Sequence, residues 1–247
     1  MRSFDRSPAQ MRPVSMMVDA NAYAEGSCLI KFGNTHILCT ASVEDRVPGF
    51  LRNSGKGWIT AEYGMLPRST HSRMDRKRSA ESGRTQEISR LIGRSLRSIA
   101  NLKAFGERQI IVDCDVLQAD GGTRTAAITG AFVCLTQAFA HLDKLGALNA
   151  IPLNDHVAAI SCGIVQNEVC CDLDYKEDSN AALDANFVMS AAGGLIEVQA
   201  TGETQPFDDA HLTQMIGLAR DATQKLVAAQ QTALQGLPLE KLIKPKS

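Results

Sequence analysis

The sequence has no apolar run that approaches the roughly 20 residues of a membrane-spanning helix. Its first residues, MRSFDRSPAQMRPVS, lack the apolar core of a signal peptide. Aromatic residues are scarce at 5%, whereas 44% of the 247 residues are hydrophobic and 21% are charged. That composition is typical of a soluble globular protein with a sizeable core. We therefore expect a cytoplasmic protein with no membrane contact.

Cysteine and histidine occur without the spacing of a metal site. The cysteines are odd in number, show no C-x-x-C spacing and lie mostly inside apolar runs; they are Cys28, Cys39, Cys114, Cys134, Cys162, Cys170 and Cys171. The five histidines are equally scattered, with no pair at ligand spacing. We expect buried, reduced thiols, and the pattern disfavours disulfides, zinc and a histidine-built metal site.

Two common nucleotide-binding patterns are also absent. The chain matches neither G-x-x-x-x-G-K-[ST] nor G-x-G-x-x-G, which argues against a P-loop ATPase and a Rossmann enzyme. It has instead QADGGTRT at residues 118–125, directly after the apolar run RQIIVDCDVL. A strand, a glycine-rich loop and a helix bind phosphate when glycines let the backbone approach and N–H groups at the helix start donate. Taken alone, the motif fits a simple turn as well.

The two arginines near predicted helix starts indicate an anion. Arg124 falls in the first turn of the helix after QADGG, where a cation is unfavourable unless an anion is bound. A second junction, SGRTQE at 82–87, places Arg84 at another helix start. Two such guanidinium groups could clamp one small tetrahedral anion, because their paired donors match its oxygens.

The basic residues are concentrated in one segment. Residues 68–97 carry net charge +6 while the whole chain carries −1; the bases are Arg68, Arg73, Arg76, Lys77, Arg78, Arg84, Arg90, Arg94 and Arg97. Helical spacing places Arg90, Arg94 and Arg97 on one face. Such a stripe could follow a phosphate backbone, form a solvated face, or pair with acids of a neighbouring subunit.

The predicted elements form two blocks, each of strands followed by a helix. The first has strands near 28–32, 36–43 and 108–118, a loop over the basic segment, and helices from 84 and from 123. After the connector LNAIPLND come four strands, HVAAISCGIVQ, EVCCDLDY, DANFVMS and GLIEVQA, and a helix from about 208 past 229. This pattern predicts an α+β protein of two similar lobes at 1–150 and 151–230, with a C-terminal tail at 231–247.

Acidic residues cluster between two of the later strands, in CDLDYKEDSNAALDANFV. Acids that flank a turn are usually solvated, and we expect this for Glu177. Asp178 and Asp184 bracket a short loop that could direct both carboxylates to one side. Paired carboxylates suit a Mg²⁺ or Mn²⁺ site that works with phosphates, and one of them can serve as a general acid.

Several blocks, in order over roughly residues 1–225, resemble the motifs of the bacterial ribonuclease PH family. They are EGSCLIKFGNTHILCTASVED, GWITAEYGMLPRSTHSR, GRTQEISRLIGRSLR, DCDVLQADGGTRTAAITGA, CDLDYKEDSNAALDANFVM and IEVQATGETQPF. The resemblance implies the ribosomal protein S5 domain 2-like fold and a homo-hexamer built as a trimer of dimers. It also implies a phosphate-dependent 3′ to 5′ exoribonuclease that trims tRNA precursors, with rRNA as a further candidate substrate and orthophosphate as co-substrate. Because phosphate and not water would be the nucleophile, we expect the reaction to be reversible, so that nucleoside diphosphates extend RNA.

The resemblance also implies roles for individual residues. The phosphate-binding residues fall on Arg84, Gly122, Thr123 and Arg124, and the aspartates tied to metal and catalysis fall on Asp178 and Asp184. The RNA-binding basic loop falls on Arg68, Arg73 and Arg76. The chain departs from the family where FGNT replaces FGDT, LDANF replaces VDMN and ATGETQPF replaces GTAEG.PF; the positions concerned are Asn34, Ala185, Gly202 and Thr204.

Two other functions use part of the same features. A metal-dependent hydrolytic ribonuclease would use the aspartates, need no phosphate cradle and release monophosphates. A non-catalytic RNA-binding ring subunit would keep the basic surface and lose the arginine clamp or the aspartates. The chain has Arg84, Arg124, Asp178 and Asp184 together, which favours the phosphorolytic enzyme over both alternatives.

Overall fold

The structure is a computed structural model that describes residues 2–77, 81–203 and 206–238. Arg78, Thr204 and residues 239–247 of the expected tail lie outside this part of the chain. The helices and short 3-10 turns are η1 (Ser3–Asp5), η2 (Gly49–Leu51), α2 (Gly83–Ser98), α3 (Thr123–Lys144), α4 (Tyr175–Asp178) and α5 (Asp209–Ala233).

The strands form two separate sheets. The first has the order β1-β2-β3-β5-β4 and consists of β1 (Val14–Val18), β2 (Gly26–Phe32), β3 (Thr35–Glu44), β5 (Gln109–Gln118) and β4 (Trp58–Met65). The second is antiparallel, has the order β7-β6-β8-β9 and consists of β7 (Glu168–Cys171), β6 (Val157–Val165), β8 (Leu183–Ser190) and β9 (Leu195–Gly202). Within the first sheet β4 and β5 run parallel, whereas the other neighbours are antiparallel.

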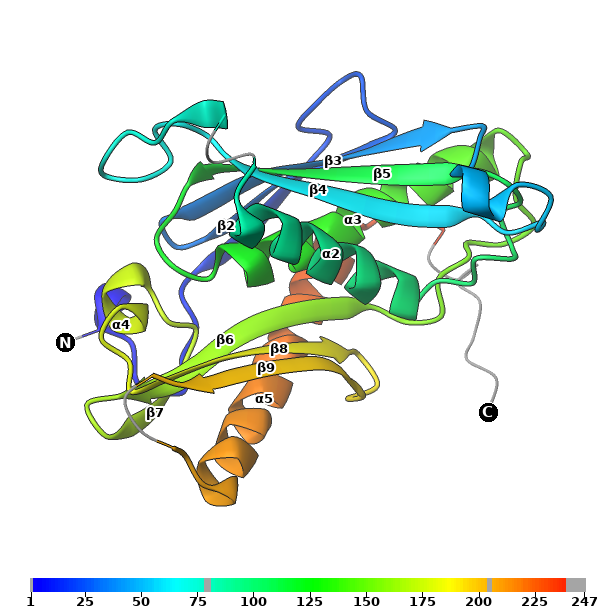
Figure 1. The fold of residues 1–247 in the computed structure, drawn as a ribbon. Coiled ribbons are helices and arrows are strands. Elements are labelled where there is room, and N and C mark those ends of the chain that lie inside the picture. Colours follow the sequence, from blue (N-terminus) through cyan, green and yellow to red (C-terminus); the bar gives the residue numbers. More distant parts are fainter. Residues whose placement is uncertain (1, 78–80, 204–205, 239–247) are drawn as a thin grey trace.

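The sheets and helices are layered (Figure 1). The first sheet lies at the top, α2 and α3 lie between the sheets, and α5 lies behind the second sheet. α3 contacts β2 and β3 on one side and β6 on the other, while α5 packs on β6 and reaches β1. Because one helix packs on both sheets, the two halves share one hydrophobic core. The α+β architecture expected from the sequence is confirmed.

α3 forms the centre of this core. Of its 22 residues 16 are buried, and the helix begins directly after the glycine-rich loop, as the sequence predicted. Its most apolar stretch, with mean hydropathy 1.3, meets the length and composition of a membrane span, although no apolar run of that length was expected. Burial explains the difference, because 83% of that stretch is enclosed by the protein.

The cysteines are all free and buried, as predicted. Burial raises the pKa of Cys28 to about 12, and hydrogen bonding to Cys39 together with burial raises the pKa of Cys114 well above its usual value. Only thiolate reacts with disulfide reagents, so both burial and the raised pKa suppress reaction.

A disulfide reagent is therefore expected to modify fewer than one thiol per chain in the native protein at pH 7.5, and seven after denaturation. Counting the released chromophore before and after adding denaturant measures both numbers. Rapid modification of two or more thiols in the folded protein would contradict this account of the core.

Candidate active site

The parallel pairing of β4 and β5 brings two helix starts to one edge of the first sheet. Each strand leads through a loop into a helix, β4 into α2 and β5 into α3. Because the carboxyl ends of parallel strands lie at the same edge, the loops emerge side by side, and α2 packs against α3. Arg84 and Arg124 are each the second residue of their helix.

The start of α3 is open to an anion. Its N-cap is Gly122, which has φ +66° and provides no side-chain cap, so side chains leave the first N–H groups of the helix free for a ligand. Ser82, in contrast, caps α2 by accepting a hydrogen bond from the Thr85 N–H at 3.2 Å. The Thr123 hydroxyl turns inward and accepts a hydrogen bond from the buried Tyr63 hydroxyl at 2.8 Å. Tyr63 therefore fixes the first residue of α3 from below.

Arg124 reaches across to α2 and β9. Its Nη1 donates to Gln199 Oε1 at 2.9 Å and lies 3.5 Å from Glu87 Oε1. The side chain is 17% exposed, so its guanidinium faces a partly enclosed space. Arg84 is exposed. Together the two arginines present one partly buried and one accessible guanidinium at the same edge.

The two predicted aspartates face these arginines. Asp178 ends α4, and Asp184 lies on β8 between Gly163 of β6 and Thr201 of β9. Desolvation by neighbouring protein raises the pKa of Asp178, although its carboxylate is exposed. The charges of Arg84 and Arg124 act in the opposite direction and lower the pKa of Asp178.

Asp184 is the more strongly shifted of the two. Burial raises its pKa to about 6, with the negative charge of Asp178 as the next cause. Arg124 and Arg84 oppose that rise. Both aspartates are within range of the charges of both arginines, so the structure brings these four predicted residues into one neighbourhood.

Sequence reasoning missed two members of this site. Glu203 follows β9, and its charge raises the pKa values of both Asp178 and Asp184. Tyr63 lies on β4, which was not predicted as a strand. Glu203 could have been found as an acid near the end of the strand that pairs with β8, because it lies two residues after Thr201, which pairs with Asp184. The strand that carries Tyr63 could have been predicted from WITAEYGM, in which apolar and polar residues alternate and in which burial alternates in the same way.

Asp178 and Asp184 are the residues that could hold a divalent cation. The negative charge of Asp178 raises the pKa of Asp184, and a cation between the two carboxylates would relieve this repulsion. Within the residues that the structure describes, no group of three or more histidine, cysteine or acidic side chains has metal-binding geometry. Water and phosphate oxygens would complete the coordination, as is usual for Mg²⁺.

The basic loop after β4 lies beside the glycine-rich loop that precedes α3. The Ala119 N–H donates to the Ser69 carbonyl at 2.8 Å, which ties the two loops together. Arg68, Arg73 and Arg76 are all exposed. A cleft of about 390 Å³ is lined by both loops, with Arg68 and His71 from the basic loop and Gln118 to Asp120 from the glycine-rich loop.

Two arginines of the stripe on α2, Arg94 and Arg97, have partners elsewhere in the chain. Arg94 pairs with Glu197 of β9 at 2.7 Å, and Arg97 stacks over Trp58 at 4.4 Å and donates to the Ile59 carbonyl. These partners belong to the same chain. The Arg94 side chain is still 50% exposed, and Arg90 is exposed as well.

The expectation that Glu177 is solvated was wrong. Glu177 is only 8% exposed and forms ion pairs with Arg2 and Arg6 of the N-terminal segment. Its carboxylate also accepts a hydrogen bond from the Asp174 N–H at 3.0 Å, while Asp174 caps α4 through the Glu177 N–H. This reciprocal capping box makes both acids structural.

The departures from the family motifs have local consequences. Asn34 donates from Nδ2 to Asp120 Oδ2 at 3.3 Å, where an aspartate would place two negative charges together. Ala185 is fully buried on β8, and Gly202 ends β9 opposite Leu183. Thr204 lies outside the described residues.

Comparisons with known proteins match nearly the whole chain. A family model described as "3' exoribonuclease family, domain 1" matches residues 10–140, and "3' exoribonuclease family, domain 2" matches residues 155–222. Ribonuclease PH of Rhodospirillum rubrum is 56% identical over 239 residues, covering 96% of this chain and 100% of that protein. Ribonuclease PH of Methylobacterium radiotolerans is 56% identical over 236 residues, covering 95% of this chain and 100% of that protein.

Solved structures match the fold at lower identity. Rice Rrp46 has a TM-score of 0.77 and 22% identity, covering 95% of this chain and 100% of that chain. A chain of the Archaeoglobus fulgidus exosome with RNA bound to the active site has a TM-score of 0.77 and 18% identity, covering 90% of both chains.

Proposed function

Because this chain belongs to the RNase PH family and is a phosphorolytic 3′ exoribonuclease, we propose that its reaction is the trimming of tRNA precursors and that Arg84, Arg124, Asp178 and Asp184 carry it. The observation behind these roles is the juxtaposition of two helix-start arginines with two aspartates whose pKa values respond to both guanidinium charges. The arginines can bind a phosphate nucleophile, and the aspartates can act on the departing 3′ oxygen.

Orthophosphate binds between the two helix starts. Arg84 and Arg124 donate to its oxygens, and the uncapped backbone at Gly122, Thr123 and Arg124 supplies further N–H donors. This fixes one phosphate oxygen for in-line attack on the last phosphodiester of the RNA. The departing group is the 3′ oxygen of the shortened chain, and the product is a nucleoside diphosphate.

The aspartates act on the departing 3′ oxygen. Asp178 and Asp184 would hold a Mg²⁺ or Mn²⁺ ion, which would supply positive charge to stabilise the transition state. Without a bound ion, burial raises the pKa of Asp184 to about 6, so Asp184 is the one of the two aspartates that can hold a proton close to neutral pH and deliver it to the departing oxygen. The bond broken and the bond formed are of similar energy, so excess nucleoside diphosphate should extend RNA by the reverse reaction.

The RNA enters along the basic loop. Arg68, Arg73 and Arg76 contact backbone phosphates, which carry no sequence information, so selectivity comes from RNA shape and a free single-stranded 3′ end. The stem of a tRNA would then stop trimming because it cannot enter. The proposal also includes a cytoplasmic location. The Archaeoglobus fulgidus exosome, which shares the fold, has RNA bound to its active site, and this supports RNA as the substrate class.

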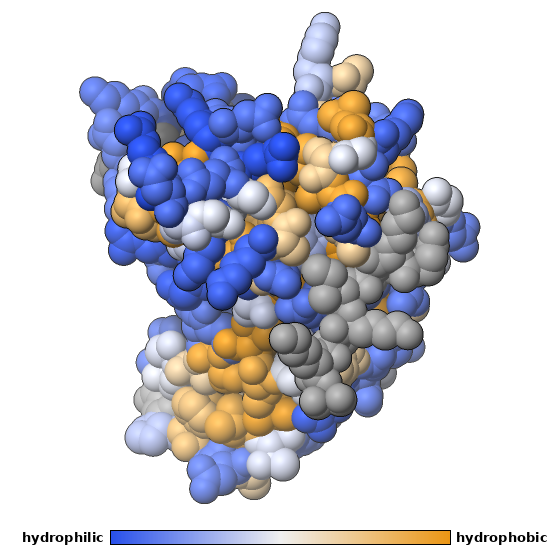
Figure 2. Space-filling view, turned by 90° about the vertical axis from the view of Figure 1, so that its right-hand side faces the viewer, coloured by the Kyte–Doolittle hydropathy of each residue, from blue (hydrophilic) through white to orange (hydrophobic). Residues whose placement is uncertain are grey.

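We assign the chain to a homo-hexameric ring built as a trimer of dimers. Figure 2 shows apolar surface gathered over the lower lobe, and β9 at the edge of the second sheet carries two exposed apolar residues, Leu195 and Val198. Apolar surface of this kind favours association between subunits. Sedimentation equilibrium should give six chains per particle.

The substrate proposal is tested with a tRNA precursor that has a 3′ extension, compared with the same extension on an unstructured RNA. With phosphate and Mg²⁺, nucleoside diphosphates should appear from both, and only the precursor should give a stable product close to the acceptor stem. Equal, complete degradation of both RNAs would contradict the tRNA assignment while leaving phosphorolysis intact.

Replacing Arg68, Arg73 and Arg76 by alanine together should weaken RNA binding at least 10-fold at low salt. Because each lost phosphate contact removes about 0.7 from the slope of log affinity against log salt, the slope should fall by about 2. A matched control replaces Arg52, Lys56 and Lys103, which are exposed at the opposite end of β4. An unchanged salt slope in the first variant, or an equal loss in the control, would remove the loop from the RNA path.

A further inference from the structure

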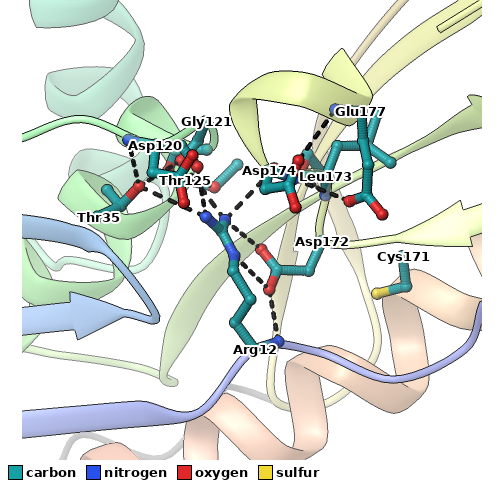
Figure 3. A network of polar contacts seen from close by, with 12 residues as sticks. Arg12, Thr35, Asp120, Gly121, Thr125, Cys171, Asp172, Leu173, Asp174 and Glu177 are labelled. Carbon is teal, nitrogen blue, oxygen red and sulfur yellow. Dashed lines mark hydrogen bonds and ion pairs between the residues drawn. The ribbon is translucent and has the colours of Figure 1, made fainter. Parts of the chain in front are cut away.

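A buried arginine connects the two loops that carry the proposed phosphate and metal sites. Arg12 precedes β1 and is 1% exposed, and its partner Asp172 is fully buried. The pair is bidentate, with Nη2 to Oδ1 at 2.6 Å and Nε to Oδ2 at 2.9 Å. The Arg12 backbone N–H also donates to Asp172 Oδ2 at 2.7 Å. The guanidinium is thus held in one orientation (Figure 3).

The remaining donors of Arg12 bind backbone carbonyls of both loops. Nη1 donates to the Asp120 carbonyl at 2.5 Å, and Nη2 lies 3.4 Å from that of Gly121, immediately before the start of α3. Nη2 also lies 3.3 Å from the Leu173 carbonyl, immediately before α4. One side chain therefore contacts the loop that leads to Arg124 and the loop that leads to Asp178.

The two loops are also in direct contact. Gly121 has φ +74°, and a Cβ there would come within 2.6 Å of Asp174 C and 2.7 Å of Leu173 O. From the other side, Thr35 of β3 donates to the Gly121 carbonyl at 2.6 Å and accepts from the Asp120 N–H at 2.9 Å. The distance between the two loops is therefore fixed by contacts to their backbones, from Thr35 of β3 and from Arg12, and by the close approach of Gly121 to the residues before α4.

Arg2 and Arg6 provide an informative contrast. Both bind the segment around α4: Arg2 donates to the Cys171 carbonyl, Arg6 donates to the Asp172 carbonyl, and both pair with Glu177. Their hydrogen bonds in the structure reach residues of the N-terminal segment and of 171–177, whereas those of Arg12 also reach Asp120 and Gly121. Only a bridge between both loops can set their spacing.

We propose that Arg12 and Asp172 are positioning residues, which hold the phosphate-binding start of α3 at a fixed distance from the aspartate at the end of α4. This inference rests on the proposed roles of Arg124 and Asp178. In-line attack requires the nucleophile and the groups acting on the leaving oxygen to be aligned, and a displacement of about 1 Å can lower the rate about 100-fold. Loss of the bridge should therefore lower turnover at saturating phosphate as well as phosphate affinity.

A double variant separates positioning from stability. Removing Arg12 alone would leave the buried Asp172 with only the longer ion pair to Arg6 at 3.5 Å. Replacing both charges is often neutral for stability, and Arg6 would keep its ion pairs with Asp174 and Glu177. We choose Arg12→Met with Asp172→Asn, because Asp172 has φ +57°, which asparagine tolerates, and the amide oxygen can still accept from the residue 12 N–H. The variant should keep its melting temperature within a few degrees and its RNA affinity within twofold. Its kcat should fall about 10- to 100-fold.

Two single variants test the same proposal if the double variant does not fold. Arg12→Lys and Arg6→Lys make the same chemical change in two neighbouring buried arginines. Arg12→Lys should lower kcat and raise the KM for phosphate at least fivefold more than Arg6→Lys does, at matched losses of melting temperature. Equal effects of the two, or a folded double variant with wild-type kcat and phosphate KM, would overturn the proposal. The wild-type protein is assayed first for phosphate-dependent diphosphate release, so failure of the proposed function is recognised separately.

Discussion

Asp184→Asn is expected to lower kcat by at least about 1,000-fold, leave RNA binding within twofold, and stabilise the folded protein at pH 7. The loss of activity follows because the amide can neither donate a carboxyl proton to the departing oxygen nor bind a cation as a carboxylate does. The gain in stability follows from burial: the native site holds the charged form of Asp184 unfavourably, with its pKa raised to about 6. The burial that raises the pKa of Asp184 and suits it to proton transfer also lowers the free energy of unfolding at neutral pH.

The stability of the folded protein depends on pH through Asp184. A carboxyl whose native pKa is raised binds its proton more tightly in the folded state, so its stabilising contribution is complete below pH 4 and is lost as the pH rises through 6. Wild-type protein should therefore lose stability relative to the Asp184→Asn variant between pH 4 and 6, by roughly 3 kcal/mol in total, and the difference should be constant above pH 7.

Thermal unfolding of both proteins from pH 4 to 8, with kcat and RNA affinity at pH 7, tests all three parts. Asp113→Asn is the matched control, because Asp113 on β5 also has a pKa raised by burial but lies outside the proposed site. The control should gain stability at neutral pH and keep its activity. An active Asp184→Asn variant would remove Asp184 from catalysis, and a pH-independent stability difference would refute its raised pKa.

Arg124→Ala is expected to raise the KM for orthophosphate at least about 100-fold and to change the KM for RNA less than threefold. The guanidinium is partly enclosed and sits beside an uncapped helix start, so an anion bound there is poorly screened by water. Arg124→Lys should fall between wild type and alanine, because the ammonium keeps the charge and loses the fork of donors.

Arg94→Ala provides the control for Arg124. Both arginines lie at the interface of α2 or α3 with β9, and Arg94 pairs with Glu197 much as Arg124 contacts Gln199. Its removal should leave the phosphate KM within twofold. Initial rates over a matrix of phosphate and RNA concentrations separate the two constants, and a larger effect of Arg124→Ala on the RNA constant than on the phosphate constant would place Arg124 elsewhere.

Local signals in the sequence were sufficient for the parts of the site that are local. Glycine-rich loops followed by helices predicted the starts of α2 and α3, and the helical spacing of Ile88, Leu91 and Ile92 predicted the buried face of α2. The D-x-x-E pattern of Asp174 and Glu177 was a capping-box signal for the short helix α4, and it was not used. β1 was also missed, because its exposed edge position leaves no continuous apolar run.

Long-range partners could not be predicted from the sequence. The parallel pairing of β4 with β5 decides that Arg84 and Arg124 meet, yet neither strand sequence specifies its neighbour. The prediction of a solvated Glu177 was wrong for this reason, and the partner of Arg94 within the chain was not foreseen. Arg2 lies 175 residues from Glu177, and Glu197 lies 103 residues from Arg94. A helical face can be derived from spacing, but the group that covers it comes from elsewhere in the chain.

The central claim is that orthophosphate, held by Arg84 and Arg124, is the nucleophile. Its most direct test is degradation of an RNA with an unpaired 3′ end in the presence of Mg²⁺ and radiolabelled orthophosphate. The account predicts one labelled nucleoside diphosphate for each residue removed, with the label in the β-phosphate, and no products without phosphate. Unlabelled nucleoside monophosphates, released at the same rate with or without phosphate, would contradict it.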